Sequence, residues 1–291
     1  MITIDAADLL PAIQALTPEQ RREMDAILMA GDAPIWVPQP GPQQQAFESQ
    51  ADILFYGGAA GGGKTDLLLG LAMTAQDHSI IFRREAVQLV GIEERATKIL
   101  GGRAGYNGQD AIWRIPGSHR ILEFGSVKEP GDWTKYQGRA HDFKGFDEIT
   151  HFTEMQFRTL IGWLRTDEPN VRQRVVAAGN PPTSAEGEWV KRFWAPWLDK
   201  AHPNPAKPGE LRWYVTNEKG EDQEVDGPAP VLVGKDMMQP KSRTFIPSSV
   251  DDNLFLQSTG YKATLQALPE PLRSQMLKGD FNASASDPVW Q

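Results

Sequence analysis

Cysteine is absent from the 291 residues, and its absence removes three kinds of chemistry. The chain forms no disulfide, carries no thiol nucleophile and holds no metal through thiolates. Histidine, another common metal ligand, occurs only five times. No two of these histidines stand at the short spacing of a ligand pair, so the sequence argues against a histidine-based metal site. They are His78, His119, His141, His151 and His202.

The sequence also lacks a long apolar run and an excess of positive charge. No run approaches the roughly 18 residues that a membrane helix needs. Met1–Leu10 contains two Asp and no Lys or Arg, unlike a signal peptide. We therefore expect a soluble, cytoplasmic protein without a membrane partner. The net charge of −8 argues against a surface that grips nucleic acid everywhere, so any DNA contact must be local or shared among subunits.

The amino-terminal part of the chain divides into a helical segment and a linker. Residues 1–36 are predicted to be helical, because Thr17, Pro18 and Gln20 match a capping box with proline at the first helical position. Pro38–Gln45 is rich in proline, glycine and glutamine, which favours a linker over a helix interior. The remaining length suits one large domain, or a core with a smaller subdomain attached.

From Ile53 onward, short apolar runs of β type alternate with helical segments. Buried strands separated by helices are typical of a mostly parallel sheet that is covered on both faces. We therefore expect an α/β fold, although the pattern does not give the strand order. The expected strands are Ile53–Tyr56, Ile80–Phe82, Ile121–Phe124, Phe143–Phe146 and Val175–Ala178, and the clearest helices are Thr65–Gln76 and Glu154–Leu164.

Beyond Pro181 the composition changes, and residues 203–240 are rich in proline, glycine and charge. Leu211–Thr216, followed by the turn-like residues 217–220, predicts a β-hairpin. Residues 259–278 are predicted to be helical, with Gly279 as the carboxyl-terminal cap.

The strongest chemical signal is the run from Gly58 to Thr65, which matches the phosphate-binding pattern G-x-x-x-x-G-K-[ST]. Its glycines allow backbone N–H groups to turn toward an anion, and the following helix directs its positive end at the same place. Lys64 supplies a charge for the β- and γ-phosphates, and Thr65 supplies a hydroxyl for Mg²⁺. The candidate nucleotide-binding residues of this motif are Gly58, Ala59, Ala60, Gly61, Gly62, Gly63, Lys64, Thr65 and Asp66.

A second signal is the acidic pair Asp147 and Glu148, which follows the strand Phe143–Phe146. A carboxylate beside a phosphate-binding loop can hold Mg²⁺, which suits Asp147. Glu148 would then polarise the attacking water as a general base. The sequence thus predicts ATP hydrolysis with Mg²⁺, with Glu148 and Lys64 as catalytic residues and with Thr65 and Asp147 as metal ligands.

Two single positions are candidates for contacts with the nucleotide. Asn180 follows the strand Val175–Ala178 and would hydrogen-bond the γ-phosphate or the attacking water. The alternative is a residue that tolerates a turn before proline. In the linker, Gln44 or its neighbour Gln43 would contact the adenine edge, or would simply be polar linker residues.

The charge that develops on the γ-phosphate usually requires an arginine. Arg139 is the first choice, because it lies shortly before the acidic strand and would project toward an adjacent subunit. Arg83 and Arg84, after the strand Ile80–Phe82, are the alternatives.

Taken in order, these stretches resemble the large terminase subunits of tailed bacteriophages. The resemblance covers nearly the whole chain from Gln39 onward. It is carried by Phe55–Thr65, Tyr136–Asp142 running into Phe146–Glu148, Ala178–Pro182, Phe245–Pro247 with Asp252–Asn253, and Leu277–Phe281.

The resemblance implies a RecA-like P-loop NTPase of the additional-strand catalytic-glutamate type, with a mostly parallel central sheet and a small lid subdomain. It also implies ATP-driven translocation of double-stranded DNA into a procapsid in the host cytoplasm. The implied partners are the viral portal protein, the small terminase subunit and further copies of the chain in a ring, with a monomer possible in isolation. Some relatives carry an arginine inside the P-loop, and this chain does not.

The same resemblance suggests a division of the chain. We expect an amino-terminal segment at 1–37, a P-loop core at 38–200, a lid subdomain at 201–282 and the start of a linker at 283–291. In the family a ribonuclease-H-like nuclease domain follows, so we expect no nuclease activity from this chain. The alternatives are another P-loop nucleic-acid motor such as a helicase, and a nucleotide-dependent assembly module with negligible turnover.

Overall fold

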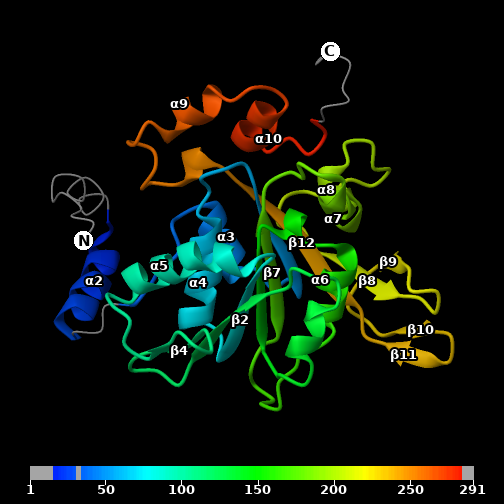
Figure 1. Ribbon diagram of the computed structural model, residues 1–291, viewed down its shortest axis with the longest axis horizontal. Helices are drawn as coiled ribbons and strands as arrows, with labels where there is room; N and C mark the ends of the chain where they lie inside the picture. Colours follow the sequence, from blue (N-terminus) through cyan, green and yellow to red (C-terminus); the bar gives the residue numbers. More distant parts are fainter. Residues whose placement is uncertain (1–15, 31–33, 284–291) are drawn as a thin grey trace.

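The computed structural model describes residues 16–30 and 34–283, which form a central sheet between two layers of helices (Figure 1). The sheet has ten strands, and the six in its centre, from β5 to β12, run parallel. In spatial order the strands are β3 (Tyr106–Asn107), β4 (Ile112–Arg114), β5 (Ile121–Ser126), β2 (His78–Arg83), β6 (Phe143–Asp147), β7 (Arg174–Gly179), β1 (Ile53–Gly58), β12 (Lys241–Ser248), β8 (Arg212–Thr216) and β9 (Asp222–Val225). A separate two-stranded hairpin consists of β10 (Val231–Val233) and β11 (Asp236–Met238).

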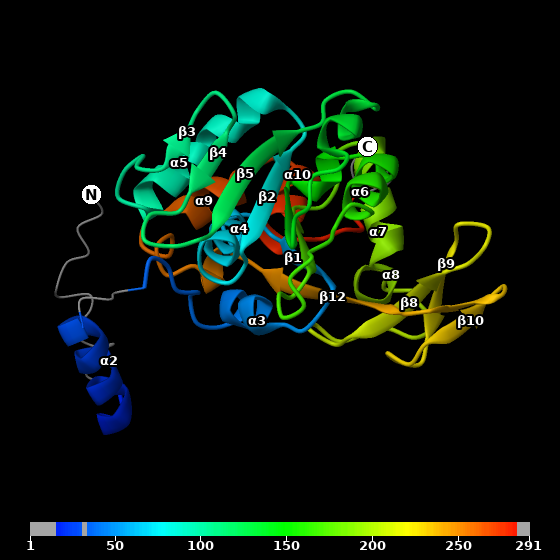
Figure 2. The ribbon, with the colours of Figure 1, turned by 90° about the horizontal axis from the view of Figure 1, so that it is seen from below.

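Helices cover both faces of the sheet, as Figures 1 and 2 show from two directions. One layer contains α3 (Pro42–Glu48), α4 (Lys64–Thr74) and α5 (Leu89–Ile99), and the other contains α6 (Glu154–Ile161), α7 (Trp189–Phe193) and α8 (Ala195–Leu198). The remaining helices are α2 (Pro18–Ala30), α9 (Tyr261–Gln266) and α10 (Leu272–Lys278). Short 3₁₀ turns are η1 (Ala86–Gln88), η2 (Asp132–Tyr136), η3 (Ile149–His151), η4 (Ala185–Gly187) and η5 (Val250–Asp252).

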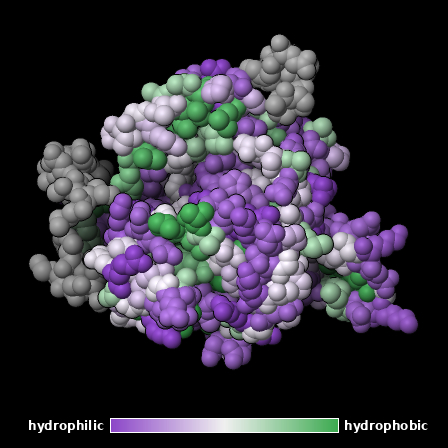
Figure 3. All heavy atoms as spheres, viewed as in Figure 1, coloured by the Kyte–Doolittle hydropathy of each residue, from purple (hydrophilic) through white to green (hydrophobic). Residues whose placement is uncertain are grey.

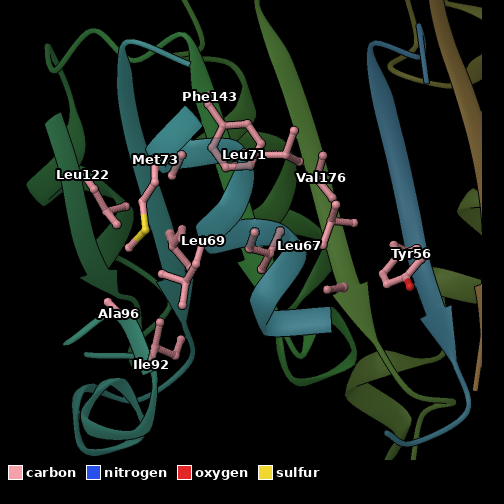
Figure 4. Packing of buried hydrophobic residues seen from close by; sticks show 14 of the residues in the cluster. Tyr56, Leu67, Leu69, Leu71, Met73, Ile92, Ala96, Leu122, Phe143 and Val176 are labelled. Carbon is pink, nitrogen blue, oxygen red and sulfur yellow. The ribbon is translucent and has the colours of Figure 1, made fainter. Parts of the chain in front are cut away.

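Helix α4 is the centre of the hydrophobic core on its side of the sheet. Leu67, Leu69 and Leu71 point in different directions around this helix, yet all three are fully buried (Figure 4). A helix that is apolar all round must be enclosed, and here the sheet, α3 and α5 enclose it. Truncating one such leucine to alanine typically costs about 2–5 kcal/mol. The core therefore fixes the position of the loop that precedes α4.

The strand order confirms the predicted fold class. β7 lies between β1, which leads into the glycine loop, and β6, which ends in Asp147. This inserted strand is the feature that the additional-strand type of P-loop fold requires. All five predicted strands and both predicted helices are present, as is the hairpin of β8 and β9. Among the described residues, no helix is both long enough and apolar enough to cross a membrane.

The capping box before α2 is confirmed, because Thr17 and Gln20 exchange both expected hydrogen bonds. The linker prediction for Pro38–Gln45 was wrong in part. Helix α3 begins there at Pro42. Proline lacks only an N–H that the first turn of a helix leaves unpaired anyway, so Pro42 starts this helix instead of breaking it.

The chain beyond residue 200 contributes both to the main sheet and to a cap on its edge. β12 pairs in parallel with β1, although it lies far along the sequence. The predicted helical stretch 259–278 is divided into α9 and α10 around Pro269 and Pro271, and Gly279 ends it in a left-handed conformation as expected. Carbonyl groups of β12 and α10 accept hydrogen bonds from Ala59 and Ala60, so this part of the chain packs directly on the glycine loop.

Candidate functional site

The glycine loop joins the end of β1 to the start of α4 along a path that side chains would obstruct. A Cβ atom on Gly57 would lie 2.3 Å from the carbonyl oxygen of Gly179. Gly63, the residue before α4, has a φ of 72° in the left-handed region. Within the described part of the chain, the N–H groups of Gly61, Gly62 and Gly63 have no hydrogen-bond acceptor. They are therefore free to bind an anion at the start of α4.

Lys64 lies at the centre of this arrangement. Its Nζ donates hydrogen bonds to Ala59 O at 2.7 Å and to Asn180 Oδ1 at 2.9 Å. An ammonium group has three N–H donors, so one remains for a ligand. Burial lowers the pKa of Lys64, and the nearby carboxylates of Glu148 and Asp147 oppose that shift. Two residues predicted for the site, Lys64 at the start of α4 and Asn180 just after β7, thus meet.

Asp147, the last residue of β6, is held from two sides. Thr65 Oγ1 donates to Asp147 Oδ2 at 3.1 Å, and Arg83 donates to the same oxygen from Nε at 2.9 Å. Asp147 Oδ1 is buried and has no hydrogen-bond partner among the described residues. A buried carboxylate oxygen without a partner, beside a threonine hydroxyl, suits a hard cation that prefers oxygen ligands. The residues present therefore fit Mg²⁺.

Glu148 follows in an uncommon backbone conformation. Its φ of 57° is left-handed, which is rare outside glycine, and the residue lines the cleft over the glycine loop. Burial and the neighbouring Asp147 carboxylate raise the pKa of Glu148, and Lys64 and Arg83 partly oppose this shift. Such a perturbed carboxyl group at a cleft is typical of a catalytic base.

A cleft of 610 Å³ opens over these residues. One wall is the P-loop with Glu148 and Asn180, and the opposite wall comes from the segment that leads into α9. That second wall includes Asn253, Phe255 and Tyr261, and the side chain of Phe255 is 51% exposed. Apolar side chains gather over the α9 and α10 region on the face in Figure 3. The cleft thus combines an anion-binding end with an apolar side.

The structure places the two linker glutamines differently from the prediction. Gln44 is exposed and hydrogen-bonds Glu48, so it does not face the cleft. Gln43 is buried, accepts a hydrogen bond from Gln39 N at 2.7 Å and donates to Gly63 O at 2.9 Å. Gln43 therefore supports the glycine loop. Which of the two points inward depends on the rotation of α3, a helix that the sequence did not reveal.

The three candidate arginines lie in different places. Arg83 contacts Asp147 at the site. Arg84 is turned away and donates to Gln156. Arg139, the first choice from sequence, binds Glu123 in β5 and does not reach the P-loop of its own chain. Arg139 was expected near the site because it lies shortly before the acidic strand in the sequence. The structure instead leaves Arg139 near the start of β6, whereas Asp147 lies at its end.

Other contacts at the site were not found from sequence. Asp66 forms a two-pronged ion pair with Arg95 of α5, with contacts of 2.7 and 2.6 Å, at the edge of the cleft. Asn253 Nδ2 donates to Gly61 O at 2.7 Å, which ties the segment before α9 to the loop. No local motif signals Arg95. Asn253 was noted only within a resembling stretch.

These features define a P-loop NTPase fold of the additional-strand type, with a cleft over the glycine loop at the carboxyl edge of a parallel sheet. A comparison with protein-family models and a search of curated proteins each gave no match. Solved structures do match. The large terminase from a thermophilic bacteriophage, in complex with ADP, is 15% identical, with a TM-score of 0.55, over 84% of this chain and 54% of that one.

The same phage terminase in complex with ATP-gamma-S gives a TM-score of 0.54 at 14% identity, over 84% of this chain and 53% of that one. This chain thus spans about half the length of the solved structures that it matches. The likeness shows that the chain has the fold of that half of a large terminase.

Proposed function

We propose that this chain hydrolyses ATP to drive double-stranded DNA into a viral procapsid, as the motor part of a large terminase. The observation that carries the proposal is the meeting of five side chains at one cleft. They come from the ends of two neighbouring strands, β6 and β7, and the start of α4, and they are Lys64, Thr65, Asp147, Glu148 and Asn180.

Each side chain has a role that its contacts support. The glycine N–H groups and Lys64 bind the β- and γ-phosphates. Thr65 and Asp147 would hold Mg²⁺, which when bound neutralises charge on those phosphates. Asn180, already hydrogen-bonded to Lys64, orients the γ-phosphate or the attacking water. Phe255 and Tyr261 supply an apolar wall for the base, a contact for which the sequence offered Gln44 or Gln43 as candidates.

Glu148 acts as the general base. It lies at the cleft, and its raised pKa makes it a stronger proton acceptor than an ordinary glutamate. Arg83 is the arginine best placed to stabilise the developing phosphate charge, because it already lies beside Asp147. We assign Arg139 no role in the catalytic site of its own chain.

The proposed DNA and assembly partners are those that the resemblance of the motif stretches implies. DNA would be held through its phosphates in a salt-dependent way, at a contact restricted to part of this acidic surface. A ring of copies docked on the portal protein, with the small terminase subunit, supplies the rest of the grip, and the complex works in the host cytoplasm. Within this division residues 38–200 act as the core and residues 201–282 as the lid, although β12 belongs to the core sheet.

The proposal is tested by ATP turnover and translocation of the wild type and of the Glu148→Gln variant. We expect the variant to bind ATP but to lose about 10²–10⁴-fold in kcat, the range for removing a general base. Turnover at the wild-type rate would remove Glu148 from this role. Separation of the strands of a forked duplex, without translocation on intact duplex, would favour a helicase instead.

A further inference from the structure

Three side chains that the nucleotide cleft does not use meet toward the opposite edge of the same sheet. His78 begins β2, Glu123 lies within β5, and His141 precedes β6 by two residues. These three strands are neighbours in the sheet, and Figure 2 shows β5 and β2 side by side. His78 Nε2 lies 2.9 Å from Glu123 Oε1, and His141 Nε2 lies 3.3 Å from Glu123 Oε2.

The spacing of these atoms suits a transition-metal ion. All three residues offer ligand atoms within 4.8 Å of one another. Ligands bound tetrahedrally at 2.0–2.1 Å lie about 3.4 Å apart. Small side-chain rotations therefore convert the cluster into three metal ligands. We propose that His78, Glu123 and His141 form a binding site for Zn²⁺ or a similar divalent ion.

The burial of His141 is a second, independent observation. This residue is 1% exposed, and among the described residues neither of its ring nitrogens has a hydrogen-bond partner. Nε2 lies 3.3 Å from Glu123 Oε2 and forms a long ion pair with it, whereas Nδ1 has no partner among the described residues. A buried imidazole held by one long contact can exchange that contact for a bond to a metal ion that Glu123 shares.

The ligand types select the class of metal. Two imidazoles with one carboxylate suit Zn²⁺, whereas Mg²⁺ and Ca²⁺ prefer oxygen ligands throughout. Three protein ligands leave the fourth position to water. β2 is six residues long, so its two ends lie roughly 16 Å apart at about 3.3 Å per residue. The site is therefore separate from the Mg²⁺ ligands at the cleft, and it ties together three adjacent strands.

Arg139 competes with the metal for the same carboxylate. Its guanidinium lies 3.1 Å from Glu123 Oε2, and its side chain is 51% exposed, so it can turn into solvent. Removal of this positive charge leaves Glu123 Oε2 to the metal. The Arg139→Ala variant is therefore expected to bind Zn²⁺ more tightly than the wild type.

The test is a titration of the whole chain, stripped of metal, with Zn²⁺, followed by calorimetry and by the visible spectrum of bound Co²⁺. We expect one Zn²⁺ per chain, a higher Tm with Zn²⁺ and a tetrahedral Co²⁺ spectrum. The His78→Ala variant removes a half-exposed side chain and should keep the fold. Its Zn²⁺ affinity should fall at least about 10-fold, the smallest loss typical when even a residue that only orients a ligand is removed.

His119→Ala is the matched control. His119 is also near the start of a strand and is paired with a carboxylate, Asp77, at 2.7 Å, but it lies outside the cluster. We expect its Zn²⁺ binding to equal that of the wild type. Equal losses in the His78 and His119 variants would mean adventitious binding at surface histidines and would overturn the site. Absence of Zn²⁺ binding by the wild type would likewise overturn it and leave the cluster as an ion-pair network.

Discussion

The two edges of the central sheet carry different kinds of polar groups. At the carboxyl edge, Lys64 lines a cleft and keeps a donor for a ligand, and the buried Asp147 behind Thr65 keeps an oxygen that is unpaired among the described residues. Toward the amino edge, His78, Glu123 and His141 lie against one another, with both histidines paired to the Glu123 carboxylate. Parallel strands bring side chains together at both edges, but only at the carboxyl edge do the connecting loops open over them. The difference teaches that convergence alone does not make a nucleotide site.

The largest expected difference between the two edges is the loss of turnover when the arginine at each edge is replaced. Arg83 lies at the carboxyl edge against Asp147, and Arg139 binds Glu123 away from it. We expect Arg83→Ala to lower kcat about 100-fold or more, since an arginine that stabilises the transferred phosphate contributes 10³–10⁵ in other enzymes. Arg139→Ala should stay within about twofold, as for a surface substitution.

Steady-state ATPase assays on the two variants measure this difference, with nucleotide binding as a check on folding. A large loss in Arg139→Ala, restored by mixing with a catalytically dead partner that retains Arg139, would show that the arginine acts across a subunit boundary. That result would reverse the assignment.

The pH dependence of turnover gives a second test of the carboxyl edge. Burial and Asp147 raise the pKa of Glu148, and a general base must be ionised to accept a proton. Turnover should therefore fall as the pH drops through this raised pKa, by about tenfold per pH unit below it. The acid limb should begin at a higher pH than for an ordinary glutamate. The profile of kcat against pH measures this, and an unchanged limb in Glu148→Gln would assign it to another group.

The strand ends explain why much of the site could be predicted from the sequence. Because parallel strands end together, Asp147 and Asn180 were expected near Lys64 before the strand order was known. Lys144 and Gly145 interrupt the apolar run at Phe143–Phe146, yet these residues form the continuous strand β6. Lys144 is buried with its Nζ donating to Leu160 O, and Gly145 leaves room for Leu68.

Positions that depend on strand order or helix rotation could not be predicted. The His78 and Glu123 pair joins residues 45 apart in sequence, and only the adjacency of β2 and β5 brings them into contact. Spacing along the sequence does not find this cluster, since its side chains come from three different strands or their ends. In the same way, the parallel pairing of β12 with β1 brings Asn253 to the glycine loop.

Alanine substitutions at Gly63 and Gly101 form a matched pair that tests the role of the glycine loop. Both residues have nearly the same left-handed φ, 72° and 71°. A Cβ at Gly63 would lie 2.7 Å from Gln43 Nε2, whereas at Gly101 nothing lies within 4 Å. Alanine at either position should cost about 1–2 kcal/mol of stability from the backbone alone. Only Gly63→Ala should also weaken ATP binding, about 10-fold, because it displaces the loop. Equal ATP affinity in both variants would contradict this role.

The smallest expected effect concerns the two neighbouring glutamines of α3. Gln43 is buried and bridges Gln39 N to Gly63 O, so its truncation leaves the buried Gln39 N–H without its acceptor, while Gly63 O keeps the hydrogen bond from Leu67 N. We expect Gln43→Ala to lower the free energy of unfolding by about 1–3 kcal/mol. Gln44→Ala removes only an exposed contact with Glu48 and should change it by less than about 0.5 kcal/mol. Urea denaturation with and without ATP measures both. If Gln44→Ala instead weakened ATP binding while Gln43→Ala did not, the assignment of Gln44 to the nucleotide would hold, and α3 would have to be rotated from the orientation described.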